Sequence, residues 1–229
     1  DFFPNERAVH DILRQLPANA RILDFGCSSG RLLAPLVGDY ACYGIEINAA
    51  AAQAAAAKGL TMLPPEELHF SEAFDAIVLI DVFEHLTSPT ALLLQLVEHV
   101  TARGVLIVGT GNADAAACRL DPGQFWYFRN VEHLCMLSRK SAHAMAAALG
   151  LTLAGWQELS HYDTSLHDRL VQSARHFAYW KFHFGSPLEK RLLAQVPGLK
   201  RAQKWPVAPA YTCSNDHVIA TFGKNTNDQ

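Results

Sequence analysis

The stretch 21–33 constrains the fold most, because an apolar run there leads directly into a glycine turn. The segment 21–25 is typical of a short buried strand, and Gly26 and Gly30 follow it. Glycine lets a backbone approach a ligand where a Cβ would collide. Leucines at helical spacing come next, so we expect strand, turn and helix, with the helix over 30–37 and its amino end facing the turn.

A second strand is predicted over 41–47, with Glu46 near its end, 20 residues after Gly26. An acidic side chain at this offset can accept hydrogen bonds from the two hydroxyls of a ribose. The two segments together predict a nucleoside cofactor lying across the ends of two parallel strands.

Alternating elements continue along the chain. Strands are predicted over 60–63, 74–81 and 105–108, with helices over 49–58 and 89–100 between them. A leading helix over 5–16 either covers the cofactor or packs on the sheet, and a helix over 139–149 precedes strands at 151–159 and 217–223. This order predicts an α/β fold with a doubly wound, mostly parallel sheet that binds its ligand at the carboxyl ends of the strands.

The segment of about 57 residues between the last two strands is too long for a hairpin. We expect a helical insertion or lid over about 160–215, within a single domain 1–229 whose core is about 18–159 and 216–224. A helix over 164–184 is expected to bury a core-facing stripe made of Leu166, Leu170, Ala174, Phe177 and Trp180. Tyr179, Phe182 and Phe184 lie off that stripe and predict a lid, or a homodimer or protein-partner contact.

Composition excludes several classes of protein. The net charge of −3 gives no general attraction to nucleic acid, and no apolar run is long enough for stable membrane insertion. Five scattered cysteines without a Cys-x-x-Cys pair predict reduced thiols and a cytoplasmic protein.

Several motifs carry a family resemblance. They are Ile-Leu-Asp-Phe-Gly-Cys-Ser-Ser-Gly at 22–30, Tyr-Gly-Ile-Glu at 43–46, Phe-Asp-Ala-Ile-Val at 74–78 and Asp-Val-Phe-Glu-His-Leu at 81–86, with a later match over 126–151. In this order and spacing the chain resembles the class I S-adenosylmethionine-dependent methyltransferases over about 21–159. It is most similar to the small-molecule type related to the ubiquinone-biosynthesis O-methyltransferases.

The resemblance implies a Rossmann-like sheet of seven strands whose last strand is antiparallel, and S-adenosylmethionine as the cofactor, leaving S-adenosylhomocysteine. The methionine part would lie over 26–30, the ribose on Glu46 and the adenine near 65–68. The implied cofactor-binding residues are Asp24, Gly26, Cys27, Ser28, Gly30, Glu46, Ile47, Pro65, Glu66, Asp81 and Val82. Ser28 departs from the family, which usually has glycine there. Pro64 and Pro65 stand where an acidic residue often meets the adenine.

Two other functions are compatible with parts of the sequence. A nicotinamide cofactor is disfavoured because the third glycine of Gly-x-Gly-x-x-Gly is missing after Gly30. A methyltransferase-like domain without turnover, acting as a binding or scaffold module, is the alternative to an enzyme. The glycine turn, Glu46 and His85 favour the enzyme.

The acceptor side of the site is predicted from residue chemistry. His85 follows the strand 74–81 and His133 lies on a later loop, and either can act as general base or serve as a structural hydrogen-bonding group. Phe125, Trp126 and Tyr127 would line the pocket of a small-molecule acceptor or pack into the core. Oxygen is favoured over nitrogen as the methylated atom.

The segment 81–85 contains potential metal ligands. Asp81, Glu84 and His85 resemble the ligands of the catechol-type enzymes. The further carboxylate and amide that such a site needs are not evident, so no metal is expected.

Overall fold

The strands assemble into one seven-stranded sheet in the order β3-β2-β1-β4-β5-β7-β6. The computed structural model describes residues 2–65, 73–209, 211–212 and 215–224. Strand β7 runs antiparallel to β5 and β6, and the other pairs are parallel, so the predicted fold class is confirmed. The strands are β1 (Arg21–Phe25), β2 (Ala41–Ile45), β3 (Thr61–Met62), β4 (Phe74–Ile80), β5 (Val100–Gly111), β6 (Leu151–Leu159) and β7 (His217–Lys224).

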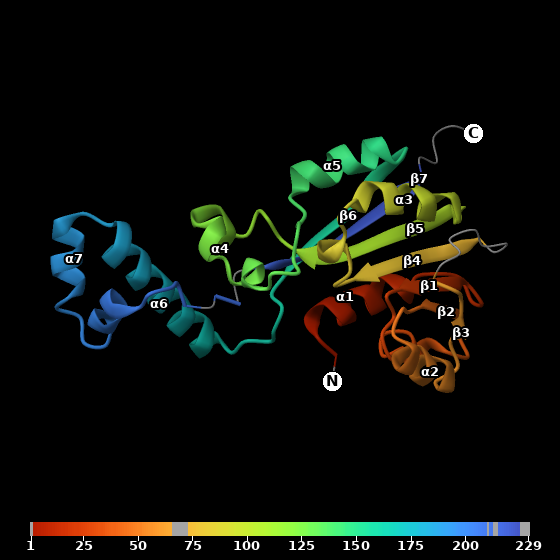
Figure 1. Cartoon of the computed structure of the whole chain (residues 1–229), viewed down its shortest axis with the longest axis horizontal. Helices are drawn as coiled ribbons and strands as arrows, with labels where there is room; N and C mark the ends of the chain where they lie inside the picture. The colour runs from red at the N-terminus through yellow and green to blue at the C-terminus, as the bar shows by residue number, and fades with distance from the viewer. Residues whose placement is uncertain (1, 66–72, 210, 213–214, 225–229) are drawn as a thin grey trace.

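Helices cover both faces of the sheet (Figure 1). The larger core cluster joins the sheet to α3 (Pro89–Glu98) and α5 (Arg139–Ala148), through residues such as Leu93 and Ala142. The second cluster lies on the other face, under α1 (Pro4–Leu13) and α2 (Ala49–Ala57). Short elements complete this part: η1 (Ala34–Leu36), η2 (Phe83–His85), α4 (Ala116–Leu120), η3 (Pro122–Gln124) and η4 (Trp126–Arg129).

The helix expected over 30–37 does not form, and this prediction was wrong. One α-type hydrogen bond runs from the amide of Ala34 to the carbonyl of Gly30, over 3.0 Å, and a 3-10 turn over Ala34–Leu36 follows. Pro35 has no amide hydrogen to continue the ladder, and Val37 is already extended with ψ 126°. The glycine turn is therefore not followed by an α-helix whose amino end would face it.

The helical insertion consists of α6 (Leu166–Phe184), α7 (Pro187–Leu193) and η5 (Leu199–Lys204), and it projects away from the sheet (Figure 1). It has its own small core, in which Ala178 and Phe182 of α6 pack with Ala202 of η5.

The expected core stripe of α6 was therefore wrong. Leu166 and Leu170 are 75% and 63% exposed, whereas Phe182, placed outside the stripe, is 6% exposed. Periodicity showed that the helix has an apolar side, but α6 packs on η5 and not on the sheet, so a different side is covered.

None of the helices in the described ranges is long and apolar enough to cross a membrane.

The buried side of α6 can be tested with a matched pair of substitutions. Phe182→Ala should lower the free energy of unfolding by about 3 kcal/mol, because it empties a packed site. Leu170→Ala, on the exposed side of the same helix, should change it by about 0.5 kcal/mol or less. Urea unfolding followed by tryptophan fluorescence measures both. A larger loss for Leu170→Ala would mean that α6 packs on the sheet after all.

Candidate active site

The glycine turn closes tightly against its neighbours at the end of β1. The amides of Gly26 and Cys27 both donate to the carbonyl of Ile45, over 2.9 and 3.0 Å, which joins the turn to the end of β2. Gly26 has φ +81°, and an added Cβ would lie 2.5 Å from a methyl group of Val82. Only glycine fits here, and the turn is held against the end of β4.

Glu46 connects the turn to the start of α2. One carboxylate oxygen accepts from the amide of Ser28 over 2.9 Å, and the other accepts from the amide of Asn48 over 2.7 Å. Asn48 in turn caps α2 by accepting from the amide of Ala51. The acidic side chain is thus fixed in place, and each carboxylate oxygen retains a lone pair for a ligand.

Ser28 and Asp81 are strained. Their φ angles are +48° and +54°, in the left-handed region that costs side-chain-bearing residues about 1–2 kcal/mol. Both residues border the cleft described below. Ser28 occupies the position where the resembled family has glycine, and its backbone takes the glycine-like conformation.

Two adjoining cavities form a cleft at the carboxyl ends of the central strands. The first, about 480 Å³, lies between the turn and the start of α1 and is lined by Phe3, Asn5, Glu6, Asp24, 26–29, Arg31, Leu32, Ile80 and Asp81. The second, about 530 Å³, is lined by Phe25, Gly26, 45–47, Pro65, Asp81, Val82, His85, Leu86 and Glu132. Gly26 and Asp81 border both cavities, so the cleft runs past the ends of β1 and β4.

The start of α1 forms one wall of the first cavity. Asn5 donates to the Asp81 carboxylate over 3.3 Å, and Arg31 forms an ion pair with Glu6 at 2.6 Å. The Arg31 guanidinium also lies over the ring of Phe3, 4.9 Å from its centre. The leading helix therefore covers the end of the cleft as well as packing on the sheet.

Carboxylates crowd the cleft and disfavour one another's charge. Burial, and then the charges of Glu46 and Glu6, raise the pKa of Asp24 to about 7. Asp81 lines both cavities with 45% of its side chain exposed, and desolvation and then Glu84 raise its pKa to about 6. Carboxylates that are desolvated and lie near other carboxylates favour the binding of a positively charged ligand.

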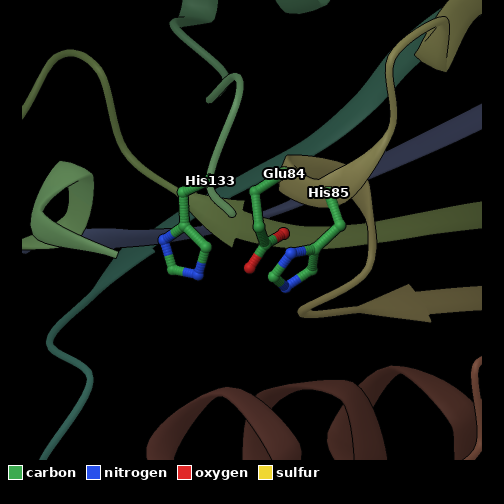
Figure 2. Close-up of side chains that lie close together, drawn as sticks. All are labelled: Glu84, His85 and His133. Atoms are coloured by element: carbon green, nitrogen blue, oxygen red, sulfur yellow. The ribbon is translucent and has the colours of Figure 1, made fainter. Parts of the chain in front are cut away.

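The two predicted histidines come together although they are 48 positions apart in the sequence. The ring centroids of His85 and His133 are 5.0 Å apart, and the carboxylate of Glu84 lies between the two rings (Figure 2). His85 Nδ1 lies 3.2 Å from the carbonyl of Glu132, and His133 Nδ1 lies 2.8 Å from the carbonyl of Tyr127. A carbonyl only accepts, so each Nδ1 carries a hydrogen, and in the neutral ring Nε2 keeps its lone pair.

The three aromatic residues expected beside the acceptor have different environments. Phe125 and Tyr127 are each 2% exposed, and Trp126 is half-buried and donates from Nε1 to Asp216 over 2.9 Å. The Tyr127 hydroxyl donates to Glu84 over 2.5 Å and accepts from the amide of Gly111 over 2.9 Å. Tyr127 therefore supports the Glu84 carboxylate, and a role of these rings in acceptor binding stays a prediction.

Sequence reasoning missed a second polar cluster at the same edge. Asp216 is fully buried and accepts from the backbone amide of His161 and from His217 Nδ1, over 2.8 and 3.3 Å. Nδ1 of His161 lies 3.2 Å from Nε2 of His217, and the same His217 nitrogen lies 3.9 Å from a carboxylate oxygen of Asp81. Burial lowers the pKa of His161 to about 4. The available signal was the direction of β7: an antiparallel strand begins at the edge where its parallel neighbours end.

The remaining predicted cofactor residues divide into three groups. Gly30, with φ +72°, ends the turn and lines neither of the two cavities. Ile47, Pro65 and Val82 line the second cavity. Glu66 lies outside the described residues.

A family model described as a methyltransferase domain matches residues 4–154. No curated protein matches the sequence.

Solved structures share the fold at low sequence identity. A chain from the complex between the Haloferax volcanii Trm112 methyltransferase activator and the putative methyltransferase matches with TM-score 0.62 and 12% identity, over 95% of this chain and 88% of that one. A putative sarcosine dimethylglycine methyltransferase from Galdieria sulphuraria matches with TM-score 0.60 and 15% identity, over 96% of this chain and 84% of that one. The magnesium protoporphyrin IX methyltransferase from Synechocystis, with bound S-adenosylhomocysteine, matches with TM-score 0.58 and 13% identity, over 96% of this chain and 84% of that one.

The strain at Ser28 predicts a stabilising substitution. Ser28→Gly should raise the free energy of unfolding by about 1 kcal/mol or less, since the relieved strain exceeds the added freedom of the unfolded chain. Ser29→Gly, one position on and without positive φ, should lower it by about 0.5–1 kcal/mol. Chemical unfolding of both variants checks the pair, and equal effects would show that the Ser28 backbone is relaxed.

The raised pKa of Asp24 predicts a dependence of stability on pH. Between about pH 4, the ordinary value, and about 7, the folded protein holds a proton that the unfolded chain has released. The contribution of Asp24 to the free energy of unfolding therefore falls as pH rises through this window. An asparagine side chain does not titrate. The free energy of unfolding of Asp24→Asn, relative to that of the wild type, should therefore increase from about pH 4 to 7. Urea unfolding at several pH values measures it, and a constant difference would contradict the burial of this acid.

Proposed function

The chain belongs to the methyltransferase-domain family and is an S-adenosylmethionine-dependent methyltransferase, and on this premise we propose that it methylates a small-molecule acceptor, on oxygen in preference to nitrogen. The observation that carries the proposal is the position of the histidine pair: His85 lines the same cavity as Glu46 and Asp81. A group able to accept a proton thus borders the pocket proposed for the cofactor.

The cleft suits S-adenosylmethionine in charge. The cofactor carries an ammonium, a sulfonium and one carboxylate. The first cavity offers Glu6, Asp24 and Asp81 to the positive groups, and the Arg31 guanidinium to the carboxylate. Neutralising these acids by a cation would remove the repulsion that raises their pKa values. We place the methionine part in this cavity, against the turn from Gly26 through Cys27 and Ser28 to Gly30.

The second cavity suits the adenosine part. Glu46 would bind the ribose hydroxyls through the lone pairs left by its two amide contacts. Ile47, Pro65 and Val82 give this cavity apolar walls for the adenine ring. Glu66 stays a prediction.

The bound cofactor supplies an electrophilic methyl group: its bond to sulfur breaks as the bond to the acceptor forms, with the electron pair left on sulfur. The chain must orient the acceptor and remove its proton. His85 and His133 are the groups we propose for this, through Nε2. Their Nδ1 contacts to backbone carbonyls hold the rings in place.

Contacts with other chains are a further part of the proposal. The helical insertion exposes apolar residues, among them Leu166, Leu170 and Phe177. They support a homodimer or a protein partner at this surface, within a single domain spanning 1–229. The four described cysteines are free thiols, which is consistent with the reducing cytoplasm as the location.

Calorimetric titration with S-adenosylmethionine tests the cofactor site. The wild type should bind, and Glu46→Ala should weaken binding by about 1.5–3 kcal/mol, the value of hydrogen bonds to a charged group. Glu98→Ala, an exposed glutamate at the end of α3, is the matched control and should leave affinity unchanged.

Two results would contradict the proposal. No binding at millimolar cofactor would favour the scaffold alternative. An affinity unchanged by Glu46→Ala would show that the ribose lies elsewhere. Thermal unfolding of each variant separates loss of affinity from loss of structure.

A further inference from the structure

Glu84, His85 and His133 form a compact group of potential metal ligands. One ligand atom from each residue lies within 4.8 Å of those of the other two. Figure 2 shows the Glu84 carboxylate between the two rings, with a ring nitrogen of each turned toward it. Around an ion with bonds of about 2.1 Å, tetrahedral ligand atoms are about 3.4 Å apart, so the three side chains must move toward one another to close the group.

The two rings are already held in place by contacts of the kind that orient metal-bound histidines. Both Nδ1 atoms donate to backbone carbonyls, which leaves Nε2 as the coordinating atom on each ring. A metal-bound histidine usually donates its other ring N–H to a carbonyl or carboxylate, which fixes tautomer and orientation. Here this outer contact exists twice, from Glu132 and from Tyr127.

Glu84 is also oriented in advance. It is 1% exposed, and its oxygens accept from the hydroxyls of Tyr127 and Thr110, over 2.5 and 2.9 Å. Tyr127 thus orients two of the three groups: its hydroxyl holds Glu84 and its carbonyl holds His133. Backbone contacts fix the loops too, since the amide of Leu134 donates to the carbonyl of Glu84 over 2.7 Å.

We propose that Glu84, His85 and His133 bind one divalent transition-metal ion of the Zn²⁺ type. Two imidazoles and one carboxylate favour such an ion over Mg²⁺ or Ca²⁺, which prefer oxygen ligands. Three protein ligands leave a coordination position open, as in catalytic zinc sites. His85 is exposed and lines the second cavity, so the open position faces the cleft.

This inference deepens the proposed function and rests on it for the identity of the reaction. A hydroxyl bound to the ion is acidified as bound water is: its O–H bond breaks, the proton goes to solvent and the electron pair stays on oxygen. The acceptor is then a small molecule that presents a hydroxyl to the ion. With the ion bound, both histidines act as its ligands and the ion activates the hydroxyl; in the metal-free protein they keep the general-base role proposed above. The sequence expectation of no metal was based on a different set, Asp81, Glu84 and His85, whereas folding brings His133 from the segment after η4 to Glu84 and His85.

The test is a titration of metal-free protein with Zn²⁺ alone, in competition with a chromophoric chelator. Wild type and His143→Gln, a control histidine exposed on α5, should bind one equivalent with equal affinity. Glu84→Gln and His133→Gln should bind it more weakly by about tenfold or more. Burial raises the thiol pKa of Cys27 to about 12 and of Cys42 to about 11, so these cysteines compete little.

Folding and function are controlled separately. Zn²⁺ should raise the Tm of wild type and His143→Gln, and not that of the ligand variants. If Glu84→Gln fails to fold, His85→Gln, at the exposed ligand, replaces it. Equal Zn²⁺ affinity in wild type and His133→Gln, or no binding by wild type, overturns the metal site. Failure to bind S-adenosylmethionine in the separate titration overturns the proposed function and leaves the Zn²⁺ result standing.

Discussion

Parallel pairing of β1 with both β2 and β4 determines where the polar residues of the site meet. Asp24, Glu46 and Asp81 lie at or just beyond the ends of these three strands, so they emerge at one edge of the sheet. The strands are held by buried apolar side chains on both faces, and the acids cannot move apart to relieve their repulsion. The free energy of the core is therefore what maintains an acidic cleft that isolated loops would not keep.

The antiparallel strand β7 extends the same constraint to the neighbouring part of this edge. Its first residues reach the edge where the parallel strands end, and they bring Asp216 and His217 beside Asp81. Glu84 arrives at the same edge from the turn after β4. The site thus divides into an acidic part, suited to a cationic cofactor, and a part rich in imidazole, suited to proton transfer or metal binding.

The sequence pattern predicts the bounds of a helix or strand correctly where interactions within that segment determine its structure. The predicted bounds of β1 and β6 match the observed ones, and Asn48 caps α2 as its side chain predicts. The helix over 30–37 failed because Pro35 and the left-handed Gly30 outweigh its apolar spacing. The buried side of α6 depends on a partner element, η5, that its own periodicity does not reveal. Glu84 and His133 were recognisable one by one, but their contact across 49 positions is a product of the tertiary fold.

The place where the helical insertion leaves and re-enters the sheet has a consequence for how this protein can change. Leu159 at the end of β6 pairs directly with His217 at the start of β7, so the two attachment points are adjacent. Strands in that arrangement need only a short turn to connect them. The helices α6, α7 and η5 therefore form an insertion between two adjacent strand ends, whereas His161 and Asp216, at the two ends of the same segment, belong to the site. The length and composition of the insertion can diverge, and with them the partners it contacts, without altering the register of the strands that support the site.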